Sequence, residues 1–279
     1  MSATFDRRRI PAPEHSTPPI YEPLPSSSEN EAGPSRRTDR GPLESRPIFL
    51  KTGLISQANG SGYIESGGVK IACSVYGPRP KPPPYSPQGS LNLEVKFAPF
   101  ASDPRRAPLR DTEPLPLSAL LTQSLLPTIH LHLYPKSSID IYLVVLESDA
   151  LSNVLSAGLT VASAAVADAG IDMYGLGVGG VLMDKSSVDG GVGVGVEEDG
   201  LLLDPSKDEE TRAKGMIVVG SMPALGKVTN LFLTGEVDVD QAVDMIDKAI
   251  SASKETHTIL AQALVEGAEE RGIGPVPAA

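Results

Sequence analysis

Two histidines separated by one residue, His130 and His132, have a type and spacing that could hold a metal ion. Imidazole nitrogens bind transition metals, but a site needs further ligands close by, and none is obvious in the sequence. Apolar residues at 129, 131 and 133 alternate with the histidines. This period of two predicts a strand with both histidines on its outward face, so we expect neither a metal nor another cofactor here.

The glycines between Gly175 and Gly180 formally match G-x-G-x-x-G, a pattern that binds the phosphates of a dinucleotide. That function requires the pattern to follow a strand and to open a helix. Here a helical pattern precedes it, and the strand-like stretch 181–184 follows it. We therefore reject a nucleotide site and predict small residues on strands that closely approach a helix.

Three arginines, Arg105, Arg106 and Arg110, lie in a polar, proline-containing loop. The formal net charge of −11 over 279 residues argues against a general electrostatic attraction to nucleic acid. Any contact with RNA should therefore depend on a local basic patch. The single cysteine, Cys73, cannot form an intrachain disulfide or a zinc cluster, which fits a reducing compartment.

Residues 1–45 are rich in proline, serine, glutamate and arginine and lack apolar periodicity, so we predict a disordered tail. Arg7 to Arg9 belong either to a nuclear-import signal or to a solvated stretch, and the second is favoured. No apolar segment follows these arginines and no apolar run reaches about 18 residues, so we expect a soluble intracellular protein with no membrane partner. The folded domain should span 46–272, with a flexible end at 273–279.

The elements that would position these residues begin with a meander between Arg46 and Pro78. Alternating apolar residues and glycine turns predict its strands at 51–56, 61–65 and 69–76. The proline cluster 79–89 then forms a rigid connection or, less favoured, a docking site for a proline-binding domain. A fourth strand over 91–97 and a helix over 117–126 follow.

The second half repeats the order of strands followed by a helix. The run 139–146 is more continuously apolar, as expected for a strand covered on both faces, and 151–168 has an apolar helical face ended by Gly170. We expect further strands at 181–184, 188–200, 216–221 and 228–235, then a helix over 240–270. The buried stripe of that helix should consist of Val239, Val243, Ile246, Ile250, Leu260 and Leu264. This order predicts a mixed α/β domain with internal duplication.

Several separated stretches resemble the ribonuclease PH-like family, in the right order. They are G-L-I-x-x-A-x-G-S-x-Y-x-E-x-G-x-x-K with V-Y-G-P in the meander, P-K-S-S-I-D-I-Y at 135–142, and D-A-G-I-D-M at 168–173, where the family has D-A-G-I-P-M. The resemblance covers residues 46 to 271 and implies the α/β ribonuclease PH-like fold. F-A-P-F, the arginine loop and L-L-D-P are most similar to eukaryotic RNA exosome ring subunits of the mRNA-transport-regulator type.

Phosphorolytic members of this family hold phosphate with a G-G-T-R-type turn at the N-terminus of the central helix. The corresponding stretch here has no glycine pair, and Asn153 stands in place of the arginine. Asp149 would place a negative charge where phosphate binds and would repel it. With Ser152, these residues would form a degenerate phosphate site.

The catalytic carboxylates of active members fall on the stretch 204–210, where Pro205 and Lys207 disrupt the family's pattern. We therefore interpret Asp204 and Glu210 as solvated or helix-capping acids. The resemblance then implies a pseudo-enzyme without catalytic residues. The alternative is a phosphate-dependent 3′–5′ exoribonuclease.

As a non-catalytic subunit, the chain would scaffold a hetero-hexameric ring of ribonuclease PH-like exosome subunits. Its other partners would be S1/KH cap subunits, a hydrolytic nuclease and single-stranded RNA, and it would serve RNA processing and decay in nucleus, nucleolus and cytoplasm. In related subunits the loop of Arg105 and Arg106 faces the central channel, so these residues and Arg110 would contact RNA. A merely solvated loop is the alternative.

Overall fold

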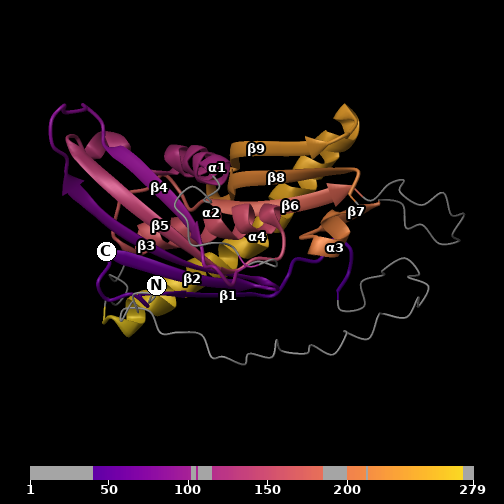
Figure 1. Ribbon diagram of the computed structural model, residues 1–279, viewed down its shortest axis with the longest axis horizontal. Helices are drawn as coiled ribbons and strands as arrows, with labels where there is room; N and C mark the ends of the chain where they lie inside the picture. Colours follow the sequence, from indigo (N-terminus) through magenta and orange to yellow (C-terminus); the bar gives the residue numbers. More distant parts are fainter. Residues whose placement is uncertain (1–39, 102–104, 106–114, 185–199, 212, 273–279) are drawn as a thin grey trace, which may run out of the picture. The chain divides into compact units, whose positions relative to one another are not determined.

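A computed structural model describes residues 40–101, 105, 115–184, 200–211 and 213–272, within a folded unit that begins at Gly41 (Figure 1). The expected N-terminal tail, the C-terminal end, Arg106, Arg110 and most of the expected strand 188–200 lie outside the described residues. These expectations stay predictions.

The first sheet has five strands in the order β1-β2-β3-β5-β4. The strands are β1 (Ile48–Thr52), β2 (Gly60–Ser66), β3 (Val69–Pro80), β4 (Ser90–Phe97) and β5 (Ser137–Glu147). The predicted meander is therefore present. Its first strand starts and ends earlier than the expected 51–56, because Gly53 takes a left-handed conformation (φ +75°) that ends the extended run. The peptide bonds before Pro78 and Pro84 are cis.

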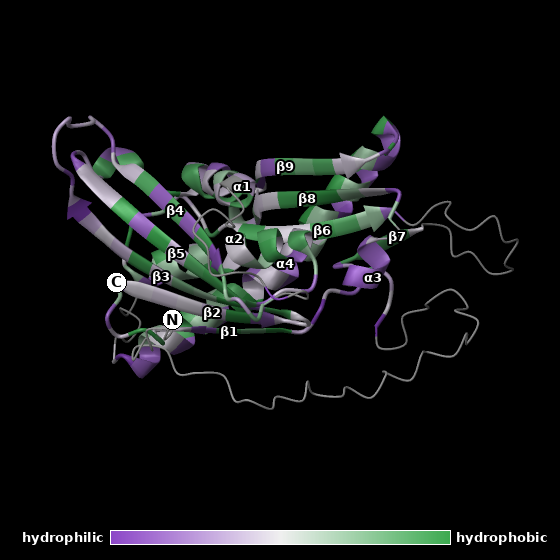
Figure 2. Cartoon of the chain, viewed as in Figure 1, coloured by the Kyte–Doolittle hydropathy of each residue, from purple (hydrophilic) through white to green (hydrophobic). Residues whose placement is uncertain are grey.

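Helices α1 (Leu115–Leu125) and α2 (Leu151–Asp168) pack on one face of this sheet. The first and last residues of α2 are those predicted from the sequence. The expectation that β5 is covered on both faces is wrong. Its side chains alternate between buried and accessible, and Tyr142 and Val144 are exposed, because none of the described helices covers the outer face. Figure 2 shows the corresponding alternation of hydrophobic and hydrophilic residues along β4.

The second sheet has the order β7-β6-β8-β9 and lies on the other side of α2. Its strands are β6 (Val178–Asp184), β7 (Leu201–Leu203), β8 (Gly215–Met222) and β9 (Lys227–Gly235). A Cβ on Gly179 would lie 2.4 Å from the Ser156 backbone of α2, and a Cβ on Gly180 would lie 3.2 Å from the Ala249 carbonyl of the last helix. The predicted close helix approach is confirmed, and it occurs on both faces of β6.

Helix α4 (Val239–Glu270) covers the outer face of the second sheet and continues beyond it to β1 (Figure 1). Gly267 permits that contact, because a Cβ there would overlap the Thr52 hydroxyl. The predicted stripe is partly wrong. Leu260 is buried, but Val239 and Val243 are exposed, and the buried face contains Met245, Ala249, Ser253, Thr256, Leu260 and Ala263. Ile246, Ile250 and Leu264 are partly buried and pack against the core. The apolar spacing therefore located the buried side of the helix but missed the small and polar residues at its centre.

Short 3₁₀ turns join several of these elements: η2 (Leu126–Thr128), η3 (Leu131–Leu133) and η4 (Pro223–Leu225). Helix α2 has the length and apolar composition of a membrane-crossing helix, but 83% of it is buried inside the domain. It is the central core helix, shared by the two sheets. The N-terminus of α2 is therefore the point at which segments from both sheets can meet.

Candidate functional site at the N-terminus of the central helix

The residues that the sequence assigned to a degenerate phosphate site lie at the start of α2. Ala150 is the N-cap and has no side chain that could cap the helix amides. Asn153, one turn into the helix, is buried, and its amide nitrogen donates a 2.7 Å hydrogen bond to the Pro205 carbonyl. The side chain in the place of the family's arginine therefore binds the chain's own backbone.

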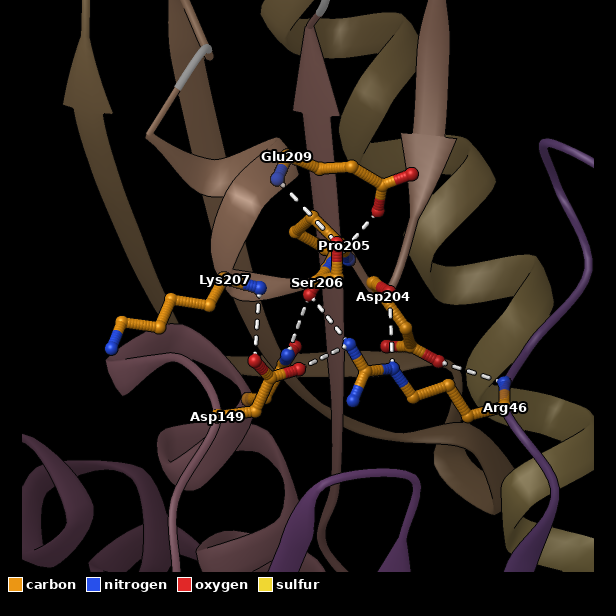
Figure 3. A network of polar contacts seen from close by, with 8 residues as sticks. Arg46, Asp149, Asp204, Pro205, Ser206, Lys207 and Glu209 are labelled. Carbon is orange, nitrogen blue, oxygen red and sulfur yellow. Dashed lines mark hydrogen bonds and ion pairs between the residues drawn. The ribbon is translucent and has the colours of Figure 1, made fainter. Parts of the chain in front are cut away.

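Arg46, which precedes β1, reaches the same position from the first sheet (Figure 3). Its Nη2 atom lies 2.8 Å from Asp149 Oδ2 and 2.7 Å from the Pro205 carbonyl oxygen. Its Nε atom donates to the Asp204 carbonyl, and its backbone N–H donates to Asp204 Oδ2. The guanidinium is only 7% exposed, so the charge of Asp149 is paired inside the protein.

The turn between β2 and β3 lies against this ion pair. A Cβ on Gly67 would lie 2.7 Å from Arg46 Nη1, and a Cβ on Gly68 would lie 3.1 Å from Asp149 Cβ. Gly67 also has a left-handed φ of +56°. The two glycines that the sequence assigned to a hairpin turn therefore also allow the turn to approach the pair closely.

The short helix α3 (Lys207–Glu210) closes the other side of the site. Ser206 and Glu209 form a reciprocal capping box, and the Lys207 backbone N–H donates a 2.9 Å hydrogen bond to Asp149 Oδ1. Asp149 thus accepts from Arg46 with one oxygen and from α3 with the other. A carboxylate between two helix N-termini is favoured by both helix dipoles.

The expected roles of Asp204 and Glu210 are not the observed ones. Asp204 is neither free in solvent nor a cap, since its carboxylate accepts from the Arg46 backbone. The capping acid of α3 is Glu209. Glu210 is partly buried beside Asp149, and its pKa is raised by burial and by the negative charge of Asp149, while the nearby Ser152 hydroxyl lowers it.

These contacts limit the chemistry that the site can perform. An anion at a helix N-terminus needs free backbone donors and a cation. Here the guanidinium of Arg46 and the amide of Asn153 both donate to the chain's own oxygens. Within the described residues, no group of three or more His, Cys, Asp and Glu side chains could hold a metal ion.

The remaining predicted site residues lie elsewhere. Arg105 is exposed, and its companions Arg106 and Arg110 are not among the described residues. His130 and His132 are not on a strand: His132 lies in η3, and Ile129 forms only an isolated bridge to Met173. The alternation that suggested a strand is broken because the chain turns at Leu131, and His130 packs its ring on Tyr174.

Comparison with known proteins places this geometry in a family. Residues 44–172 match the 3′ exoribonuclease family, domain 1. Over 93% of its length the chain is 36% identical to the exosome complex component mtr3 of Schizosaccharomyces pombe, of which 96% is covered. The chain belongs to the ribonuclease PH family, among the MTR3-type exosome components. The human exosome complex component MTR3 is 34% identical over 98% of this chain and 99% of its own length.

More distant members of the ribonuclease PH family agree. The exosome complex component Rrp41 of Thermoplasma acidophilum is 32% identical over 83% of this chain and 89% of its own length. The crystal structure of rice (Oryza sativa) Rrp46 has a TM-score of 0.66 at 19% identity, covering 81% of this chain and 98% of that one. This structural likeness shows the ribonuclease PH-like fold, as the sequence predicted.

Sequence reasoning found Asp149, Ser152 and Asn153 but missed Arg46 and the Lys207 backbone. Arg46 is separated from Asp149 by 103 residues and from Pro205 by 159. No spacing pattern connects residues so far apart. The available signal was a charged residue shortly before an apolar stretch. Such a residue is more often solvated.

Proposed function

We propose that this chain is a non-catalytic subunit of an exosome ring, which scaffolds the ring and does not itself degrade RNA. The observation that carries the proposal is the Arg46–Asp149–Pro205–Asn153 network. The guanidinium of Arg46 and the amide of Asn153, which could otherwise hold a phosphate at the N-terminus of α2, both donate to the protein's own oxygens. Binding phosphate there would require breaking a buried ion pair, which costs about 3–5 kcal/mol.

An assay of phosphorolysis tests this part of the proposal. The purified chain is incubated with inorganic phosphate and a single-stranded RNA, and release of nucleoside diphosphates is measured beside an Asn153→Ala control. We expect no release from either protein. Release by the parent chain above the control would establish the alternative function, a phosphate-dependent 3′–5′ exoribonuclease.

Exposed apolar side chains on the second sheet support the scaffolding role. Strand β9 is an edge strand, and it exposes Val228, Leu231 and Leu233. Val239 and Val243 at the start of α4 are exposed as well. An open strand edge with apolar side chains favours pairing with another chain, and each subunit of a ring must form two heterologous interfaces.

The assembly is tested by reconstitution with the other ribonuclease PH-like ring subunits from the same source. Leu231→Glu with Leu233→Glu should remove the chain from the ring in size-exclusion chromatography, because two charges would be buried in the interface. Thr258→Glu, at an exposed position of α4, is the matched control and should assemble normally. Normal assembly of the double variant would exclude β9 as an interface.

Contact with RNA in the ring channel is proposed for the loop that holds Arg105, Arg106 and Arg110. The exposure of Arg105 supports this RNA contact. Because the chain has a net negative charge, RNA should be bound by this basic loop and not by the surface as a whole. In the intact ring, Arg105→Glu with Arg106→Glu should lower RNA affinity and reduce the salt slope by a little under one unit per lost phosphate contact. Unchanged affinity and slope would assign the loop to solvent. Such a subunit would act with cap subunits and a hydrolytic nuclease in nucleus, nucleolus and cytoplasm.

A further inference from the structure

The connection between β3 and β4 presents a short peptide at the end of the first sheet. Figure 1 shows this loop projecting from the sheet end that points away from the second sheet, at the upper left. Two backbone hydrogen bonds to Lys136 fix the loop: Lys81 N donates to the Lys136 carbonyl, and Lys136 N donates to the Ser86 carbonyl. The residues between these two anchors are 82–85, with the sequence P-P-P-Y.

These four residues contribute little to the folded domain. All three prolines are exposed, and the Tyr85 side chain is 60% exposed. The described contact of the Tyr85 ring is the Lys136 ammonium, 5.4 Å from the ring centroid. The described contacts therefore do not explain why an exposed tyrosine follows three exposed prolines. Aromatic residues make up only 4% of the chain, so a tyrosine here is not expected from composition.

The sequence P-P-x-Y is a peptide pattern that small aromatic-grooved modules of the WW type bind. Two aromatic side chains of such a module grip the prolines, and a neighbouring pocket takes the tyrosine. Proline-rich peptides lose little conformational entropy on binding, and a segment anchored at both ends loses less still. The exposed cations Arg79 and Lys81 beside the motif favour a module with an acidic rim.

The same pattern occurs a second time in the chain, as Pro18-Pro19-Ile20-Tyr21, outside the described residues. With 26 prolines and 7 tyrosines in 279 residues, roughly 0.06 occurrences are expected by chance, so two copies exceed what the composition explains.

From the sequence and exposure of residues 82–85 we propose that this loop is a docking site for a WW-type module. The site is separate from the Arg46–Asp149 network and from β9. It recruits an additional protein to the chain and requires no RNA. Binding is therefore expected for the isolated chain and for the assembled ring alike.

The test uses the purified full chain and a recombinant WW domain selected for P-P-x-Y peptides, with affinity measured by titration calorimetry. A Tyr21→Ala background isolates the loop. In that background, Tyr85→Ala should weaken binding at least tenfold, because the tyrosine pocket is left empty. Pro87→Ala lies outside the pattern, so it should bind within about twofold of the background.

Two further measurements make the result decisive. The melting temperature of Tyr85→Ala should match that of the parent, because the ring is exposed. This measurement is needed because loss of the fold would also abolish binding. An SH3 domain is the competing module, because residues 80–83 and 84–87 also fit its P-x-x-P pattern. It should bind at least tenfold more weakly than the WW domain. The proposal is overturned if the Tyr21→Ala chain does not bind the WW domain, if Tyr85→Ala binds equally well, or if the SH3 domain binds as tightly. None of these outcomes depends on phosphorolysis or ring assembly.

Discussion

The two ends of α2 are each held by an aspartate–arginine pair, and the two pairs differ in burial and in their relation to the helix dipole. At the N-terminus, Arg46 and Asp149 have side chains that are 7% and 18% exposed. At the C-terminus, Asp168 is 2% exposed, whereas its partner Arg271 is 40% exposed. A carboxylate is stabilised by the dipole at the first end and destabilised at the second.

The N-terminal pair is a junction of several segments, whereas the C-terminal pair connects the ends of two helices. Arg46 donates to Asp149, Asp204 and Pro205, and thereby joins the start of β1 to the segment between β7 and α3. Arg271 pairs with Asp168 and thereby ties the end of α4 to the end of α2, while Asp168 also accepts from the Ser61 backbone. Arg271 is therefore far more accessible to water than Arg46.

The largest effect is expected from Arg46→Ala. Removal of the guanidinium leaves Asp149 without its charge partner and removes three hydrogen bonds, so stability should fall by about 3–5 kcal/mol in urea unfolding. Arg46→Lys restores the charge but not the branched geometry, and should recover only part of the loss. A loss below about 1 kcal/mol for the alanine variant would mean that the junction contributes little.

Gly67→Ala should destabilise the N-terminal junction of α2 by crowding Arg46. The new Cβ would lie 2.7 Å from Arg46 Nη1, at a residue whose φ is +56°. We expect a loss of about 2 kcal/mol, of which roughly 1–2 kcal/mol is the left-handed backbone penalty. Gly53→Ala is the matched control, because its φ is +75° and nothing lies within 4 Å of its Cβ. Equal losses in the two variants would show that the approach to Arg46 is not tight.

Arg271→Ala should have a smaller effect, about 1–2 kcal/mol, since water can reach a half-exposed guanidinium site and the Ser61 backbone still donates to Asp168. Hydrogen exchange should rise at the C-terminal turns of α4 and leave β7 unchanged. Faster exchange at β7 as well would contradict the separation of the two ends.

Glu210→Gln should produce the smallest change, and in the stabilising direction. Burial raises the pKa of Glu210 in the folded chain, so the ionised carboxylate opposes folding, and stability is lost as pH rises through the folded value. The amide removes this penalty. The melting temperature should rise slightly at pH 8, by an amount worth less than about 1 kcal/mol, and the gain should disappear at about pH 4, where both states are protonated. A gain that persists at low pH would exclude ionisation as its cause.

The sequence predicted elements whose signals are local and missed contacts whose signals are distant. Helix α2 was located correctly because 18 residues keep one apolar face and Gly170 follows. The stripe of α4 was predicted only in part, because its contacts with β6 and β8 also involve Ala249 and Ser253, which carry no strong apolar signal. In the candidate site, Asn153 could be compared with a family motif, but nothing in the sequence links Arg46 to Pro205.

The contact between Arg46 and Pro205 limits the order in which the protein can fold during its synthesis. Arg46 is synthesised 159 residues before Pro205, its acceptor. At translation rates of about 5–20 residues per second, the arginine waits roughly 8–30 s for its partner. The first sheet can pair during this interval, but the N-terminus of α2 cannot close. During synthesis, nascent chains should therefore have the first sheet formed and the junction open until Pro205 has been made.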